Sequence, residues 1–289
     1  GVTPMRARIL LLMISVVGHY MPTALAAAPV KVAAVFSLSG IAASHNAPLA
    51  KLAQLAASEI NQNGGVLGRH LELILIDNQS TAIGSTRAAE EAVRLGAAAV
   101  IGAHWSSHSL AMAPVLQKHG IPMITPASTH PDVTLVGDYI FRVCFVDSSQ
   151  GQAMARFARE HLGFHRVVVL KNMDEAYSTV LGDHFKKAFQ EAGGTILLDR
   201  SYRGKAVDFS DIVRELMSLG PDAVYLPGYT RDSGLLIRQA KTRGLKAVFL
   251  GGDAWDEIYS IAGETLAGSF QSAPWHPQVP LAASRHLQK

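Results

Sequence analysis

Short apolar segments alternate with amphipathic ones along most of this chain, and this alternation most limits the folds that it can adopt. Residues 31–37 are apolar and rich in β-branched side chains, which is typical of a buried strand. From Asn46 to Asn61, apolar residues recur at intervals of three and four, which predicts one face of a helix. This order of apolar strands and helices predicts parallel sheets that helices cover on both faces.

The alternation continues to residue 250, so we expect an α/β fold throughout. Further strands are predicted at 71–76, 98–102, 121–125, 166–170, 195–198, 222–226 and 246–250. Further helices are predicted at 85–95, 110–119, 177–192, 208–219 and 232–243.

Glycines that end helices and strands recur at a nearly constant distance in the two halves of the chain. The matching positions are Gly64 and Gly193, Gly102 and Gly228, and Gly120 and Gly244. Such a repeat predicts two Rossmann-like lobes built on one plan. We expect the first lobe at residues 29–140 and the second at 141–271, with a hinge within 138–150. Residues 272–289 have the character of a return segment towards the first lobe.

The start of the chain has the pattern of a secretory signal. Arg6 and Arg8 precede an apolar run at residues 9–17, and small residues follow at 24–26. The run is too short to cross roughly 30 Å of hydrocarbon, so a membrane anchor fits less well. We therefore expect residues 1–26 to be a signal peptide and the mature chain to be periplasmic.

Composition and motifs exclude several classes of function. The formal net charge of +3 is too small to favour nucleic-acid binding. The only cysteine, Cys144, cannot form a disulfide within one chain. No phosphate-binding loop, nucleophile elbow or zinc-protease motif is present, so we expect no enzyme and no cofactor. His104 and His108 have a metal-ligand spacing but lack further ligands nearby, so we expect no metal site.

Polar residues gather where the predicted strands end, at the edge where open α/β sheets bind ligands. The segments are 102–107, 125–131, 174–177, 228–229 and 251–255. Ser106 and Ser107 open a helix, where they could bind a carboxylate or simply cap the helix. Tyrosines and Asp253 in the second half would face these groups. Such a site suits a small zwitterion held by both of its charges.

Several segments resemble the periplasmic leucine/isoleucine/valine-binding proteins of ABC importers, which have the type 1 periplasmic-binding fold. The segments are VAAVFSLSG at 32–40, EINQNGGVLG at 59–68, GIPMITPAST at 120–129, DSSQG at 147–151, YLPGY at 225–229 and IAG at 261–263. The resemblance covers residues 31–275. It implies a binding protein that closes about a hinge on a branched-chain or related amino acid and delivers it to a membrane permease.

The resemblance also implies roles for single residues. Ser106 would contact the ligand carboxylate, and Ala127 and Thr129 would contact both of its charged groups. Tyr177 and Tyr229 would close over the ligand, and Asp253 would face its ammonium group. His45 and Trp105 would shape the side-chain pocket.

Two departures from the family leave alternatives open. The family's first-lobe disulfide would need cysteines near Ser80 and Trp105, where this chain has none. The family's chains also continue well past residue 289, so the resemblance implies a fold truncated at its C-terminus. The alternatives are a receptor of the same fold that senses an amide or amino acid, and a non-functional truncated homologue.

Overall fold

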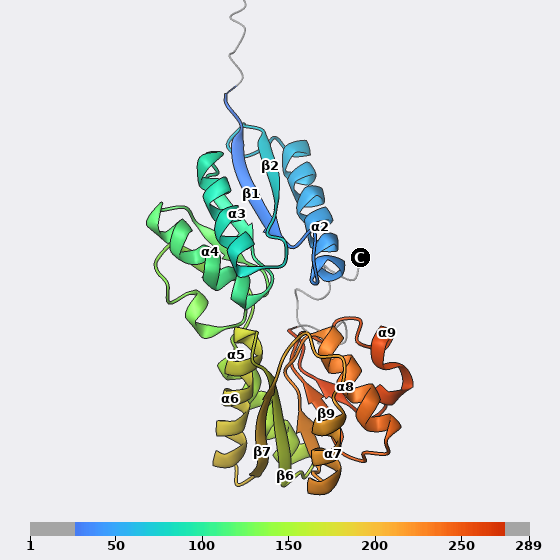
Figure 1. The fold of residues 1–289 in the computed structure, drawn as a ribbon. Coiled ribbons are helices and arrows are strands. Elements are labelled where there is room, and N and C mark those ends of the chain that lie inside the picture. The colour runs from blue at the N-terminus through green and yellow to red at the C-terminus, as the bar shows by residue number, and fades with distance from the viewer. Residues whose placement is uncertain (1–26, 275–289) are drawn as a thin grey trace, which may run out of the picture.

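A computed structural model describes residues 27–274, which form two lobes stacked end to end (Figure 1). The expected signal peptide at 1–26 lies outside the described residues, and so does 275–289, most of the expected return segment. Among the helices of residues 27–274, none is both long and apolar enough to cross a membrane.

The first lobe is a five-stranded parallel sheet with the strand order β2-β1-β3-β4-β5. Its strands are β1 (Val30–Phe36), β2 (Leu71–Asp77), β3 (Ala99–Gly102), β4 (Met123–Thr125) and β5 (Ile140–Arg142). Its helices are α2 (Ala43–Gln62), α3 (Ala82–Arg94) and α4 (Ser106–Lys118). Alternate residues of β1 enter two apolar cores, Ala33 and Val35 facing α3 and α4, and Ala34 and Phe36 facing α2.

The second lobe is another five-stranded parallel sheet, with the order β10-β9-β8-β6-β7. Its strands are β6 (Arg166–Asn172), β7 (Thr195–Tyr202), β8 (Ala223–Tyr225), β9 (Val248–Gly251) and β10 (Phe270–Gln271). Its helices are α5 (Asp147–Arg156), α6 (Ala176–Glu191), α7 (Ser210–Leu219), α8 (Thr230–Thr242) and α9 (Tyr259–Ala262). Separate apolar cores lie on the two faces of this sheet, one under α5 and α6 and the other under α7 and α8.

The two sheets share one strand plan. In each lobe the first strand, β1 or β6, lies between the second and third strands of that lobe, and the fourth and fifth follow outward. This order confirms the prediction of two α/β lobes that repeat one architecture. Parallel strands also bring all their carboxyl ends to one edge, so each lobe presents one edge rich in loops.

The described chain crosses between the lobes at residues 143–146. The expected hinge segment, residues 138–150, contains this crossing, and its flanking residues belong to β5, which pairs with β4 in the first sheet, and to α5, which begins at Asp147. β5 also carries the first sheet two residues past the boundary expected at residue 140. Beyond this, the division of the chain into domains stays a prediction.

Candidate functional site

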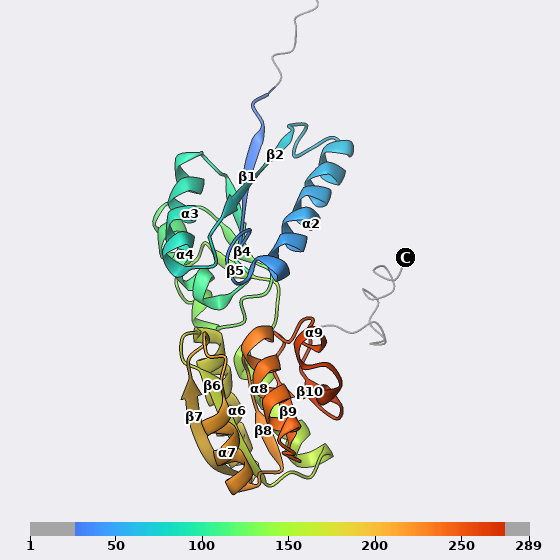
Figure 2. The ribbon, with the colours of Figure 1, turned by 45° about the vertical axis from the view of Figure 1, so that its right-hand side comes forward.

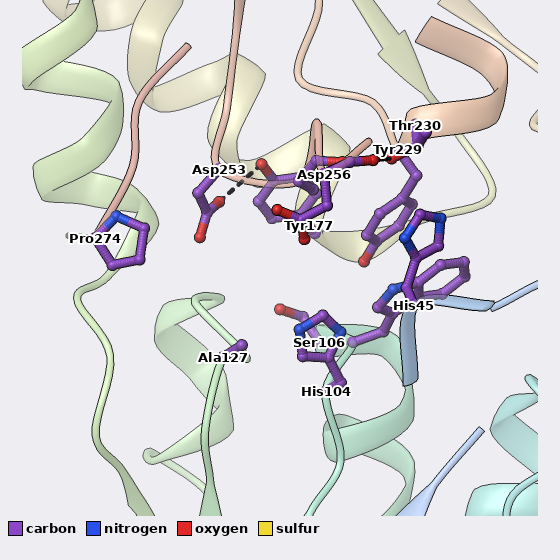
Figure 3. Close-up of a pocket in the computed structure, with 12 residues that line it drawn as sticks. His45, His104, Ser106, Ala127, Tyr177, Tyr229, Thr230, Asp253, Asp256 and Pro274 are labelled. Carbon is purple, nitrogen blue, oxygen red and sulfur yellow. Dashed lines mark hydrogen bonds between the residues drawn. The ribbon is translucent and has the colours of Figure 1, made fainter. Parts of the chain in front are cut away.

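A cavity of about 160 Å³ lies where the loop-bearing edges of the two lobes meet (Figure 3). The residues that line it are His45, His104, Trp105, Ser106, Ala127, Tyr177, Tyr229, Thr230, Asp253, Ala254, Asp256 and Pro274. Ser106, His104 and Ala127 face it from the first lobe, and Tyr177, Asp253 and Asp256 face it from the second. The volume lies below the range of drug-sized pockets and suits a small molecule.

Most lining residues follow the carboxyl end of a strand. The end of β3 leads to residues 104–106, and the end of β4 leads to Ala127. In the second lobe, β8 leads to Tyr229 and β9 leads to residues 253–256. Strand order therefore gathers residues from distant parts of the sequence at one site.

The structure brings together all but one of the eight predicted site residues. His45, Trp105, Ser106, Ala127, Tyr177, Tyr229 and Asp253 line the cavity. Thr129 is buried but is not among the lining residues, and its carbonyl accepts a hydrogen bond from the Asp147 amide at 3.0 Å. Its backbone is thus bonded to the first residue of α5.

Sequence analysis missed other lining residues, chiefly His104, Thr230 and Asp256. Each lies within three residues of a predicted site residue and follows the same strand end. The Thr230 hydroxyl donates to the carbonyl of Asp256 at 2.5 Å, which holds the loop after β9 against the start of α8. Thr230 and Asp256 each follow a predicted segment by one residue, whereas His104 lies within the segment 102–107, where it was considered only as a metal ligand.

Asp253 is the most strongly fixed acid of the cavity. Its Oδ1 accepts hydrogen bonds from the Tyr177 hydroxyl at 2.9 Å and from Gln150 Nε2 at 3.0 Å. Burial raises the pKa of Asp253, and these two hydrogen bonds act against that rise. A carboxylate held in this way would bind a cationic group of a ligand.

The serines at the start of α4 do not cap the helix. Trp105 occupies the N-cap position and makes no side-chain capping bond. Ser106 Oγ instead accepts a hydrogen bond from the His130 amide at 3.2 Å, and Ser107 Oγ donates to Glu175 at 2.9 Å. Simple capping, one of the two alternatives from the sequence, is therefore wrong. The positive end of α4 faces the cavity and can attract an anion.

The side chains of His104 and His108 lie in different surroundings, although their spacing matches that of metal ligands. His104 lines the cavity, whereas His108 Nδ1 lies 3.3 Å from the Asn78 amide nitrogen. Burial, reinforced by the charges of His45 and His108, lowers the pKa of His104 to about 4, so the imidazole is neutral at pH 7. Within residues 27–274, no group of three or more histidines, cysteines or acids could hold a metal ion.

Aromatic side chains from the two lobes touch across the cavity. The Trp105 and Tyr229 rings stack with centroids 3.9 Å apart and planes 14° apart. Tyr177 packs beside Tyr229 at 5.4 Å. Burial raises the pKa of the Asp256 carboxyl, and the charge of His45, in the opposite lobe, opposes that rise. Side chains of both lobes therefore form the site and contact one another across it.

Comparison with known proteins agrees with this geometry. A family model described as periplasmic binding protein matches residues 29–289. The chain is 31% identical over 245 residues to a Leu/Ile/Val-binding protein homolog of Brucella melitensis, a match that covers 84% of this chain and 66% of the relative. It is 30% identical over 253 residues to a leucine-, isoleucine-, valine-, threonine- and alanine-binding protein of Pseudomonas aeruginosa, covering 86% and 68%.

Solved structures have the same fold. A leucine binding protein, LivK, from Thermotoga maritima superposes with a TM-score of 0.82 at 35% identity, covering 89% of this chain and 74% of that one. LivJ from Streptococcus pneumoniae, in complex with isoleucine, gives 0.76 at 28% identity, covering 81% and 68%. The chain spans about two thirds of the length of the curated relatives. With two repeated α/β lobes, a shared cavity and these matches, the chain belongs to the periplasmic binding protein family.

Proposed function

We propose that this protein is the extracytoplasmic, periplasmic solute-binding component of an ABC importer, and that it holds a branched-chain or related amino acid between its lobes. The observation that carries the proposal is Asp253, which faces the cavity with one carboxylate oxygen held by Tyr177 and Gln150. Its Oδ2 accepts no hydrogen bond from the described residues and is directed towards the first lobe (Figure 3).

The two lobes offer complementary groups to a zwitterion. The start of α4, with the buried hydroxyl of Ser106, supplies donors and a positive dipole end for a carboxylate. Asp253, on the opposite lobe, supplies a negative charge for an ammonium group. An amino acid can satisfy both groups only when the lobes are close together. Binding would therefore stabilise the closed arrangement, because only that arrangement makes both sets of contacts.

The relatives support the ligand class and the partner. Their names describe proteins that bind leucine, isoleucine and valine, and LivJ is described as the substrate binding protein of a branched-chain amino acid transporter. We infer a membrane permease as the partner of this chain and binding without turnover as its activity. Thr129 keeps its proposed role only if closure brings its backbone to the ligand.

Isothermal titration of the full chain with leucine, isoleucine and valine tests this proposal. We expect saturable binding of at least one, and a thermal shift, since ligand at about 100 times Kd adds roughly 2.7 kcal/mol of stability. Asp253→Asn should weaken binding by about 1.5–3 kcal/mol, the usual contribution of a hydrogen bond to a charged group. Asp211→Asn, a change in a side chain that is 79% exposed, is the matched control. The proposal would be overturned if the chain bound none of the three amino acids.

A further inference from the structure

The carboxylate of Asp253 is oriented by neutral groups alone. Its Oδ1 accepts from the Tyr177 hydroxyl and the Gln150 amide, at 2.9 Å and 3.0 Å. Among the described residues, no lysine, arginine or histidine forms an ion pair with it. Its negative charge therefore remains without a cationic partner on the side that faces the cavity.

Gln150 binds Asp253 at two points. Its Oε1 accepts from the Asp253 backbone amide at 2.9 Å, while its Nε2 donates to the Asp253 carboxylate. The Ser272 hydroxyl donates to the same Oε1 at 2.6 Å, and Asp147 Oδ1 accepts from Nε2 at 3.4 Å. The side-chain amide thus uses both its donor and its acceptor capacity, which restricts its rotation.

Gln150 acts on the cavity without lining it. The residue lies in α5, is 3% exposed, and is absent from the residues that face the cavity. Gly252 keeps this contact close, because a Cβ there would lie 3.0 Å from Gln150 Oε1 and 2.1 Å from the Tyr177 hydroxyl. A shift of the Gln150 side chain would therefore also move Asp253.

Arg142, a cation whose charge acts on the neighbouring Asp147, is bonded within the first lobe. Arg142 donates to the carbonyls of Ser128, His130 and Pro131 and to the Thr134 hydroxyl, all in the first lobe. Asp147, the other acid beside Gln150, is fully buried, and its Oδ2 has no hydrogen-bond partner. The environment of Asp253 thus combines neutral donors and a second acid, which leaves a ligand as the source of positive charge.

We propose that Gln150 is a positioning residue that fixes Asp253 through neutral hydrogen bonds and so makes the site require an ammonium group on its ligand. The inference rests on the proposed function and adds to it the residue that sets this requirement. A cationic side chain beside Asp253 would neutralise the unpaired charge that selects the ligand, whereas the neutral amide of Gln150 leaves it in place.

The test compares leucine with 4-methylpentanoate, which is leucine without its α-amino group. For the wild-type full chain, we expect titration calorimetry to give at least 100-fold tighter binding of leucine. In Gln150→Met, which keeps the length of the side chain but cannot donate, this ratio should fall at least tenfold. Gln150→Leu gives the same comparison should the methionine variant fail to fold.

A matched control separates positioning from general destabilisation. Gln239 accepts from the Phe209 amide and donates to the Val207 carbonyl, both at 2.8 Å, within the second lobe and away from the cavity. Gln239→Met should lower the melting temperature but leave the leucine to 4-methylpentanoate ratio unchanged. An unchanged ratio in the Gln150 variants, or an equal change in Gln239→Met, overturns the role of Gln150. Wild-type chain that binds none of leucine, isoleucine and valine overturns the proposed function, and this inference with it.

Discussion

The Ser107 hydroxyl of α4 donates a hydrogen bond to the Glu175 carboxylate at 2.9 Å, and this bond joins the two lobes directly. Ser107 lies in the first turn of α4, and Glu175 immediately precedes α6. Helix α4 belongs to the first lobe and α6 to the second (Figure 2). Neither residue lines the cavity. It connects the N-terminal ends of two helices from different lobes.

The Glu175 contact should make stability depend on pH. Burial raises the pKa of Glu175 from 4.5 to about 7, although the Ser107 hydrogen bond opposes this rise. The folded chain then holds this proton more tightly than the unfolded chain, so its contribution to stability is lost as pH rises from about 4.5 to 7. Urea denaturation should show that the free energy of unfolding falls less between pH 5 and pH 8 in Glu175→Gln than in wild type. Equal losses would show that Glu175 does not titrate in this range.

The stack of Trp105 on Tyr229 should couple the two lobes energetically. Ring pairs of this geometry contribute about 0.5–1.5 kcal/mol beyond their burial, as measured by double-mutant cycles. A cycle of Trp105→Leu and Tyr229→Leu in chemical denaturation should give a coupling of that size. Trp105→Leu combined with Phe209→Leu, a buried residue elsewhere, should be additive within about 0.5 kcal/mol. Additivity in the first pair would contradict a direct contact.

Gly252 should be needed for ligand binding because of space rather than backbone conformation. An added Cβ would lie 2.1 Å from the Tyr177 hydroxyl, so that hydroxyl would have to leave Asp253. We expect Gly252→Ala to weaken amino-acid binding at least tenfold in calorimetry. In a Tyr177→Phe background, which removes the clashing oxygen, Gly252→Ala should weaken amino-acid binding less. A full tenfold loss in that background as well would refute the steric account.

Phe185 should contribute strongly to the core of the second lobe. It is fully buried and stacks on Tyr225 with ring centroids 3.9 Å apart. Phe185→Ala should lower the free energy of unfolding by about 3–5 kcal/mol, through lost burial and the cavity that remains. Met217→Ala, at a side chain 46% exposed, should change it by less than about 1 kcal/mol. Comparable losses in both variants would contradict this description of the core.

Strong periodicity allowed most of the fold to be predicted. The strands at 31–37 and 166–170 and the helix at 177–192 occur within a few residues of their predicted positions. β5 has only three residues, which is too short for a periodic pattern to appear. α5 was missed because its residues DSSQGQAMAR carry few apolar side chains, and its packing against α6 determines its conformation.

The candidate site was predictable only where it follows strand ends. Asp253 and Tyr229 follow apolar strands and are themselves polar or aromatic, which marks them in the sequence. Gln150 carries no such signal, because its contact with Asp253 joins positions 103 residues apart. Its role depends on how α5 packs beside the loop after β9, and that packing is a property of the tertiary structure.

The short crossing at residues 143–146 has a further consequence. Within residues 27–274, each lobe keeps its own parallel sheet and its own apolar cores, so a cut at this crossing would separate no strand from its sheet. The halves would then meet through contacts such as Trp105 with Tyr229 and Ser107 with Glu175. An amino acid that bound to both separated halves would stabilise their association. Such a ligand-dependent heterodimer could serve as a split biosensor.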